Sequence, residues 1–281
     1  MKTVFTLRAQ DGRTLIEILV AITIGLMLTV GILSIFGANR QTYRASSDLQ
    51  RMQAAGQLAL DRLAYQVRMA GYGQIVGDFT SVSNPTSFTG NPVWVCWSGF
   101  NDPVQAIETP ACVPPLPPGT TQPDALQVRY QVENAAAVGS GENRDCLGFK
   151  VDPDGSGIRT AQNRFYIATS NGVRTLMCAG NGLAPAPLIP NVEDLHIRLR
   201  LGDPFTRAQQ VVEDLVGFTD WGRVIGVELC VQVVSEGTGL VEGGTTAGVQ
   251  NGTDCRGAAF AQDGRLRRTF TQAVTLRNRV M

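Results

Sequence analysis

The chain has very little histidine, few aromatic residues and no net charge, and each scarcity excludes a class of function. His196 is the single histidine among 281 residues, so a catalytic group that needs a histidine base has one candidate. The 24 Lys and Arg residues are matched by 24 Asp and Glu residues, which gives no electrostatic reason to expect nucleic-acid binding. Aromatic residues are 7% of the chain beside 31 Gly and 14 Pro, which favours a loop-rich body over a helical bundle.

Sequence motifs for nucleotide and hydrolytic chemistry are also missing. The chain contains no P-loop, no G-x-S-x-G elbow and no H-E-x-x-H motif. His196 lies in a strand-like alternation, where a histidine on the surface of a sheet is commoner than a catalytic one. We therefore expect a protein that is not an enzyme and has no catalytic residues.

No cysteine occurs in the first 90 residues, and none of the six cysteines forms a C-x-x-C pair. With one histidine in the chain, a zinc cluster lacks its usual ligand spacing. An even set of spread cysteines after an apolar segment indicates disulfides formed in an oxidising compartment. Among the possible connectivities we predict the sequential one, which joins Cys96 to Cys112, Cys146 to Cys178 and Cys230 to Cys255.

What the sequence does contain is a membrane-length apolar run near its start. From Ile18 to Asn39 there are 22 residues without a charge. At about 1.5 Å per residue they span roughly 33 Å, close to the hydrocarbon thickness of a bilayer. A secretory signal would be shorter and would end at a small-residue cleavage site. Lys2, Arg8 and Arg13 precede the run, which favours a cytoplasmic N-terminus and an exported C-terminal bulk.

One acid, Glu17, lies just inside the start of this run. A carboxylate near the centre of a membrane helix costs about 2.5–3.5 kcal/mol on insertion scales, and less near the interface. Two interpretations stay open. Glu17 is either an acid tolerated at the membrane edge or a carboxylate that pairs with a cation on a neighbouring subunit.

Gly12 followed by Arg-Thr-Leu-Ile-Glu, directly before the apolar run, resembles the prepilin motif of type IV pilins and type II secretion pseudopilins. In that family a prepilin peptidase removes a short basic leader after the glycine, and the new N-terminal residue is methylated. The resemblance implies cleavage between Gly12 and Arg13, N-methylation of Arg13, and pairing of Glu17 with the N-terminal amine of an adjacent subunit. The usual first mature residue is Phe, so Arg13 departs from the pattern.

A helical period continues beyond the membrane-length run. Apolar and small residues recur every three or four positions, at Leu49, Met52, Gly56, Leu60, Leu63, Val67 and Ala70. Gly71 is the predicted helix stop. The pattern predicts one long helix, with a transmembrane half over residues 13–36 and an amphipathic half over residues 37–71.

After Tyr72 the composition changes to Gly, Pro, Asn, Ser and Thr with short apolar runs between them. Apolar residues alternate with others most clearly over 195–201 and 227–233. Other strand candidates are 93–97, 125–131, 164–169, 173–177 and 266–276. Because no helices alternate with these strands, we predict an antiparallel sheet. The predicted fold class is α+β and type IV pilin-like, with the long helix packed on a β-sheet head over residues 72–281.

One cluster has the spacing of a metal site. Asp152, Asp154 and Ser156, followed by Gly157, resemble the start of a calcium-binding loop. The twelfth position of such a loop is Asn163, which lacks the bidentate carboxylate of the complete motif. Calcium binding by Asp152, Asp154 and Ser156 is thus one interpretation, and an ordinary Asp/Gly turn is the commoner one. No other cofactor is expected.

Two further stretches, residues 56–74 and 266–279, resemble a narrower group, the PilW-type minor pilins. The resemblance implies a leader over residues 1–12, a single-pass anchor in the inner membrane, and a periplasmic head with disulfides. It also implies partners, which are other minor and major pilins, the prepilin peptidase and the inner membrane. The implied function is initiation of type IV pilus assembly with other minor pilins, at the pilus tip, in support of attachment and twitching motility.

Three alternatives remain open from the sequence. A minor pseudopilin of a type II secretion system would share the anchor but serve a different machine, and genomic neighbours separate it from a pilin. A membrane-anchored periplasmic enzyme would keep an uncleaved N-terminus. A tip adhesin, which is compatible with the minor-pilin reading, would use the head loops to hold a surface ligand.

Overall fold

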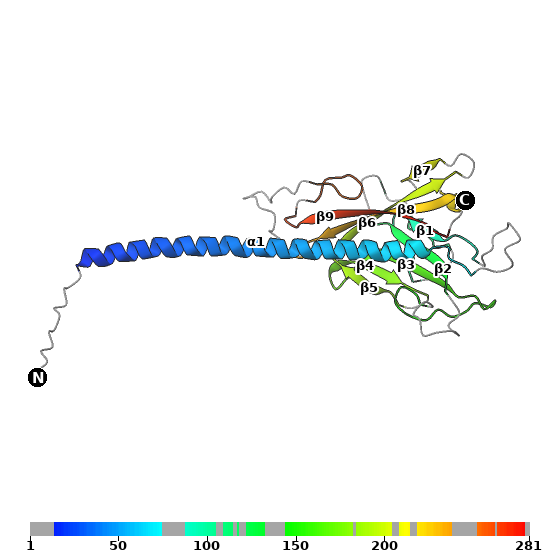
Figure 1. Ribbon diagram of the computed structural model, residues 1–281, viewed down its shortest axis with the longest axis horizontal. Coiled ribbons are helices and arrows are strands. Elements are labelled where there is room, and N and C mark those ends of the chain that lie inside the picture. The colour runs from blue at the N-terminus through cyan, green and yellow to red at the C-terminus, as the bar shows by residue number, and fades with distance from the viewer. Residues whose placement is uncertain are drawn as a thin grey trace, which may run out of the picture. The chain divides into compact units, whose positions relative to one another are not determined.

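The computed structural model describes residues 14–74, 88–104, 109–114, 117, 122–132, 144–181, 184–203, 208–213, 218–237, 252–261 and 263–278. The chain divides into two compact units, Met1–Ser47 and Asp48–Met281, and helix α1 (Leu15–Met69) contributes residues to both (Figure 1). The predictions of leader cleavage and N-methylation fall on Gly12 and Arg13, which lie outside the described residues.

In the first unit the structure describes the N-terminal part of α1. This helix is long and apolar enough to cross a membrane. Three hydroxyl groups of its apolar part are satisfied within the helix, because Thr23, Thr29 and Ser34 each donate to the carbonyl three residues earlier, at 2.8–2.9 Å. A hydroxyl bonded in this way needs no water, so it is compatible with an apolar surrounding.

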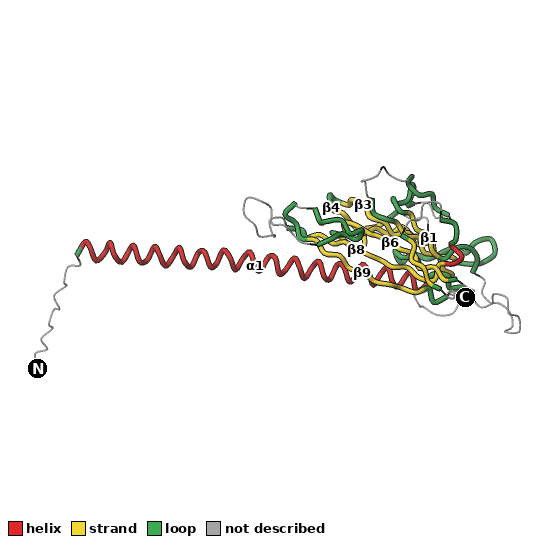
Figure 2. The backbone as a smooth tube through the Cα atoms, turned by 90° about the horizontal axis from the view of Figure 1, so that it is seen from above, coloured by secondary structure: helices red, strands yellow, loops and turns green. Residues whose placement is uncertain are grey.

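The second unit, here called the head, contains two antiparallel sheets in its described residues. The first has the strand order β1 (Val93–Cys96), β2 (Ala125–Gln131), β3 (Thr160–Ser170), β4 (Val173–Ala179) and β5 (Ala186–Pro190). The second has the order β7 (Gln209–Val212), β6 (Val192–Gly202), β8 (Val224–Val234) and β9 (Arg267–Thr275), with a short 3-10 helix, Trp221–Arg223, before β8. Figure 2 shows strands of the head alongside the last turns of α1. The fold is therefore α+β, as predicted.

The C-terminal half of α1 and both sheets share one hydrophobic core. The predicted stripe supplies its helical part, since Met52, Leu60, Leu63, Val67 and Ala70 are all buried. Leu49 was also predicted on this stripe, but its side chain is 39% exposed. The buried part of the stripe begins at Met52.

Two glycines fix where α1 packs and where it ends. A Cβ at Gly56 would lie 2.3 Å from the Phe270 ring, so the glycine allows β9 to approach the helix closely. Gly71 has a φ of 74°, a left-handed conformation that costs glycine little and that ends many helices. The helix ends at Met69, within two residues of the predicted stop.

Each predicted strand overlaps an observed one, namely β1, β2, β3, β4, β6, β8 or β9, and the predicted ranges 93–97 and 266–276 extend one residue beyond the end of β1 and beyond each end of β9. The strands β5 and β7 were not predicted. Both are short edge strands, and β5 contains Pro187 and Pro190 while β7 begins with Gln209 and Gln210. Proline is tolerated in β5 because one side of an edge strand needs no ladder hydrogen bonds. The prolines of β5 and the glutamines of β7 explain why neither sequence carries the usual strand signal.

The structure joins Cys96 to Cys112, Cys146 to Cys178 and Cys230 to Cys255, which is the sequential pairing predicted. Each bond ties a loop to a strand, namely β1, β4 and β8 in turn. All cysteines of the chain are paired. Three disulfides in one head fit a protein that matures in an oxidising compartment.

Candidate functional site

The N-terminal part of α1 presents large apolar side chains on all of its sides. From Leu15, which is 77% exposed, to Phe36, which is 62% exposed, none of its large apolar side chains is buried. A helix that is apolar all round is stable only where lipid or other apolar helices surround it. This segment has the length and composition of a membrane-spanning helix, and we call it the assembly helix (residues 15–36).

Glu17 lies in the first turn of the assembly helix. An acid in this turn is favoured by the positive end of the helix dipole. Its side chain is exposed, and no residue within the described ranges forms an ion pair with it. An exposed carboxylate is compatible with both interpretations left open by the sequence, and the pairing of Glu17 with a neighbouring subunit stays a prediction.

The far end of the assembly helix has the features of a membrane interface. The Arg40 guanidinium lies over the Phe36 ring, 5.8 Å from its centroid, and the Tyr43 ring is 76% exposed. Aromatic and basic residues collect where hydrocarbon gives way to headgroups. The uncharged run therefore ends where an anchor of this length would leave the membrane.

The head contains a buried cluster of charges around Asp124, which lies just before β2. One Asp124 carboxylate oxygen accepts hydrogen bonds from the Ile197 backbone N–H (2.7 Å) and interacts with His196 Nδ1 (2.8 Å). The other accepts from Arg256 (2.9 Å), which also pairs with Asp194. Burial raises the pKa of the Asp124 carboxyl, and His196 and Arg256 oppose that rise.

This cluster corrects the prediction that His196 is a surface residue. The histidine is 7% exposed, because the Asp124 carboxylate supplies the partner that a buried imidazole needs. No described serine, threonine or cysteine hydrogen-bonds to His196, so the arrangement lacks the nucleophile of a catalytic pair. The cluster has a structural explanation, since it joins the segment before β2 to β6 and to the loop after Thr253.

A second charged cluster joins β9 to β6. The Arg267 side chain is 2% exposed and donates to Glu193 (2.7 Å) and to Asp263 (2.6 Å). Burial alone would raise the pKa of Glu193, but hydrogen bonds from Arg267 and Gln232 outweigh it and lower the pKa. Both clusters consist of satisfied charges that link segments distant in sequence, which suits a rigid head.

Asp154, one of the predicted calcium ligands, closes its own turn. Its Oδ1 accepts the backbone N–H groups of Ser156 (2.8 Å) and Ile158 (2.9 Å), and Gly157 has a φ of 79°. Asp145 and Asp254 make the same pair of bonds to the backbone two and four residues later. The recurrence of this Asp-x-x-Gly turn favours an ordinary turn, the commoner of the two interpretations, for the segment that contains Asp154.

Within the described ranges, no group of three or more His, Cys, Asp or Glu residues is arranged to hold a metal ion. Calcium binding by Asp152, Asp154 and Ser156 stays one of the two interpretations, and calorimetry can test it. Because the Asp154 carboxylate is already engaged, we expect no heat of binding when the full chain in detergent is titrated with millimolar Ca²⁺. A saturable heat that disappears in Asp152→Asn would instead establish a calcium loop.

Comparison with known proteins relates the chain to one family model and to solved structures. Residues 164–278 match the family model described as Type IV Pilus-assembly protein W. Among solved structures the chain is similar to a type IV-like pilin from Thermus thermophilus, at 15% sequence identity and a TM-score of 0.39, over 81% of this chain and 96% of that one. No curated protein matches the chain.

Proposed function

We propose that this chain, whose residues 164–278 match the family of type IV pilus-assembly protein W, is a minor pilin of a type IV pilus system. In this proposal it is a non-catalytic subunit. The assembly helix packs against the corresponding helices of other pilins, and the head selects its neighbours.

The observation that carries the proposal is the presence of two features in one chain. The matched segment runs from within β3 to the residues just after β9, which is about half of the head. The assembly helix lies outside that match and is exposed and apolar on all sides. A filament subunit needs both parts, because lateral packing of such helices removes their apolar surface from solvent and lipid.

The proposal includes processing and location. A prepilin peptidase cuts between Gly12 and Arg13, Arg13 becomes the methylated N-terminal residue, and residues 1–12 are lost. The assembly helix then holds the chain in the inner membrane with the head in the periplasm. The basic residues before the apolar run and the disulfides in the head support this orientation.

The proposal also includes a mechanism of assembly. Glu17 pairs with the N-terminal amine of a neighbouring subunit as the chain joins other minor and major pilins. A group of minor pilins formed in this way initiates the pilus and sits at its tip, in support of attachment and twitching motility. Glu17 is exposed and has no ion-pair partner among the residues that the structure describes, which supports this step.

Deletion of the gene tests the proposal. We expect few surface pili and little twitching in the deletion strain, both restored by a wild-type copy. Electron microscopy counts the pili and a stab assay measures motility. Normal piliation with failed secretion of a type II substrate would instead assign the chain to the pseudopilins, and genes for a secretion channel beside it would agree.

A further inference from the structure

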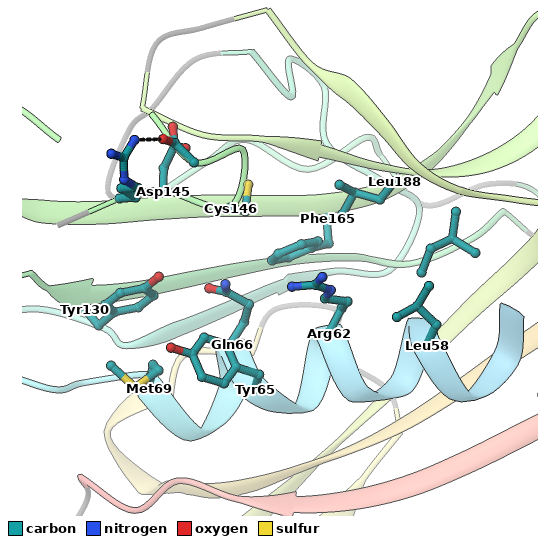
Figure 3. A pocket seen from close by; sticks show the side chains of 13 residues that line it. Leu58, Arg62, Tyr65, Gln66, Met69, Tyr130, Asp145, Cys146, Phe165 and Leu188 are labelled. Carbon is teal, nitrogen blue, oxygen red and sulfur yellow. Dashed lines mark hydrogen bonds between the residues drawn. The ribbon is translucent and has the colours of Figure 1, made fainter. Parts of the chain in front are cut away.

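The head has a pocket of about 430 Å³ between the last turns of α1 and the first sheet. Figure 3 shows Arg62 and Gln66 rising from the helix toward the sheet, with Phe165 and Leu188 on the opposite wall. The loop that contains Asp145 and Cys146 lines it as well. Its volume lies within the roughly 300–1,000 Å³ of typical ligand pockets.

The interior of this pocket is apolar and its lip is exposed. Phe165 and Ile189 line it and are 1% and 3% exposed, so they belong to the packed core. At the lip, Leu58 and Tyr65 are 47% and 56% exposed. Large apolar side chains left open beside a packed core are typical of sites that receive an apolar group from a partner.

A hydrogen-bond network fixes the polar groups of the pocket. Asn163 Nδ2 donates to Gln66 Oε1 (2.8 Å) and to the Tyr130 hydroxyl (3.1 Å), and its Oδ1 accepts from the Cys146 backbone N–H (2.9 Å). Burial raises the pKa of Tyr130 to about 12, so this hydroxyl is neutral at physiological pH. The Gln66 and Tyr130 side chains of the pocket are therefore uncharged and held in place by hydrogen bonds.

The rim has a positive excess. Arg62 and Arg144 lie on it, and within the described ranges no residue forms an ion pair with Arg62. Asp145 is the lining carboxylate, but it is 7% exposed and accepts backbone N–H groups, including that of Asn181 (3.2 Å), with both of its oxygens. The charge of the guanidinium groups at this rim is not matched by an available acid of the lining. The rim therefore favours a ligand that carries a carboxylate.

The shape favours a peptide over a small molecule. The helical wall runs from Leu58 to Met69, a rise of about 16 Å at 1.5 Å per residue. An extended chain covers that length in about five residues. A groove of this length, with apolar walls and a cationic rim, is complementary to a short peptide segment that carries both kinds of side chain.

We propose that this pocket is a docking site for a segment of another pilus subunit that presents a large apolar or aromatic side chain beside an aspartate or glutamate. The apolar side chain inserts between Leu58, Phe165 and Leu188, and the acid pairs with Arg62 and Arg144 at the rim. The identity of the partner as a pilus subunit rests on the proposed function. The chemistry of the segment rests on the pocket alone.

A defined peptide tests the site on the full chain in detergent micelles. The probe is Gly-Asp-Phe-Leu-Asp-Gly with blocked ends and a fluorine on the phenylalanine ring, followed by ¹⁹F NMR, with empty micelles as the blank. We expect a saturable change in the fluorine signal. The same peptide with Asn in place of Asp is expected to bind at least about tenfold more weakly.

Arginine variants connect this binding to the rim. Arg62→Gln is expected to weaken the Asp peptide about tenfold and to leave the Asn peptide unchanged. Arg51→Gln is the matched control, because Arg51 is on the same helix but pairs with Glu236 away from this pocket. It is expected to bind both peptides as the wild type does.

Three results would overturn the inference. They are no saturable signal, equal binding of the Asp and Asn peptides, and a loss in Arg51→Gln as large as in Arg62→Gln. Binding of free 3-phenylpropionate as tight as that of the peptide would assign the pocket to a small molecule instead. Because the assay uses the isolated chain, its failure leaves the pilin proposal standing, and a failed pilus test leaves the peptide result standing.

Discussion

Replacement of Arg256 by methionine is expected to lower the free energy of unfolding of the head by about 3–5 kcal/mol. Arg256 pairs with both Asp124 and Asp194, and the Asp124 side chain is 1% exposed. Methionine removes the positive charge but keeps much of the side-chain volume, so the buried Asp124 and the partly buried Asp194 lose their shared cation. Removal of one partner from a buried ion cluster is costly because the remaining contacts of Asp124, with His196 and Ile197, no longer include the Arg256 charge.

Chemical unfolding of the full chain in detergent, followed by tryptophan fluorescence, measures this change. Trp97 reports on the site, since its ring lies 6.3 Å from the His196 ring. Arg51→Met is the control, because the Arg51–Glu236 pair is largely exposed and such pairs contribute about 0–1 kcal/mol. An Arg256→Met variant as stable as this control would contradict the role given to the cluster.

The same variant has a predicted pH dependence. Burial raises the pKa of Asp124 in the folded protein, and loss of Arg256 removes one of the effects that oppose this rise. An acid whose folded pKa exceeds its unfolded pKa binds more protons when folded, so stability increases as the pH falls through the folded pKa. The deficit of Arg256→Met relative to wild type should therefore shrink on acidification.

Replacement of Glu17 by alanine is expected to abolish piliation and co-purification with other pilins. In the assembled state this carboxylate would be buried among apolar helices and paired with an amine. Removal of one partner from such a pair costs roughly 3–5 kcal/mol, which corresponds to a loss of association of about a hundredfold or more. Pull-down of tagged chain from native membranes and pilus counts measure the two effects.

Two further variants identify charge as the cause. Glu17→Gln keeps the length of the side chain but not its charge, so it should fail as Glu17→Ala does, whereas Glu17→Asp should retain part of the activity. The head should unfold as in the wild type in all three variants, because Glu17 belongs to the first unit, Met1–Ser47, and not to the head. A Glu17→Ala chain that still co-purifies with partner pilins and restores piliation would refute this role.

Features with a local signal could be predicted from the sequence. The apolar run and Glu17 stand out because membrane length and charge are visible in a single segment. The strands β6 and β8 alternate apolar and polar residues, so their period alone identifies them. The disulfide pairing followed sequence order, and the described structure has the same order.

Features formed by distant residues could not be predicted. His196 was interpreted as a surface residue because its partner, Asp124, lies 72 residues earlier and no pattern connects the two. Asp194 and Arg256, the other members of that cluster, are 62 residues apart. The pocket beside α1 likewise needs helix, strand and loop together. The recurrence of Asp-x-x-Gly at Asp145, Asp154 and Asp254 was a readable signal that would have favoured the turn over the calcium loop.

Mass spectrometry of the N-terminal peptide, from chain purified out of native membranes and out of sheared pili, tests the central claim most directly. A minor pilin should begin at a methylated Arg13 in the membrane and should occur, with the same N-terminus, in the pilus fraction. A chain that begins at Met1 and never enters the pilus or its base would contradict the account.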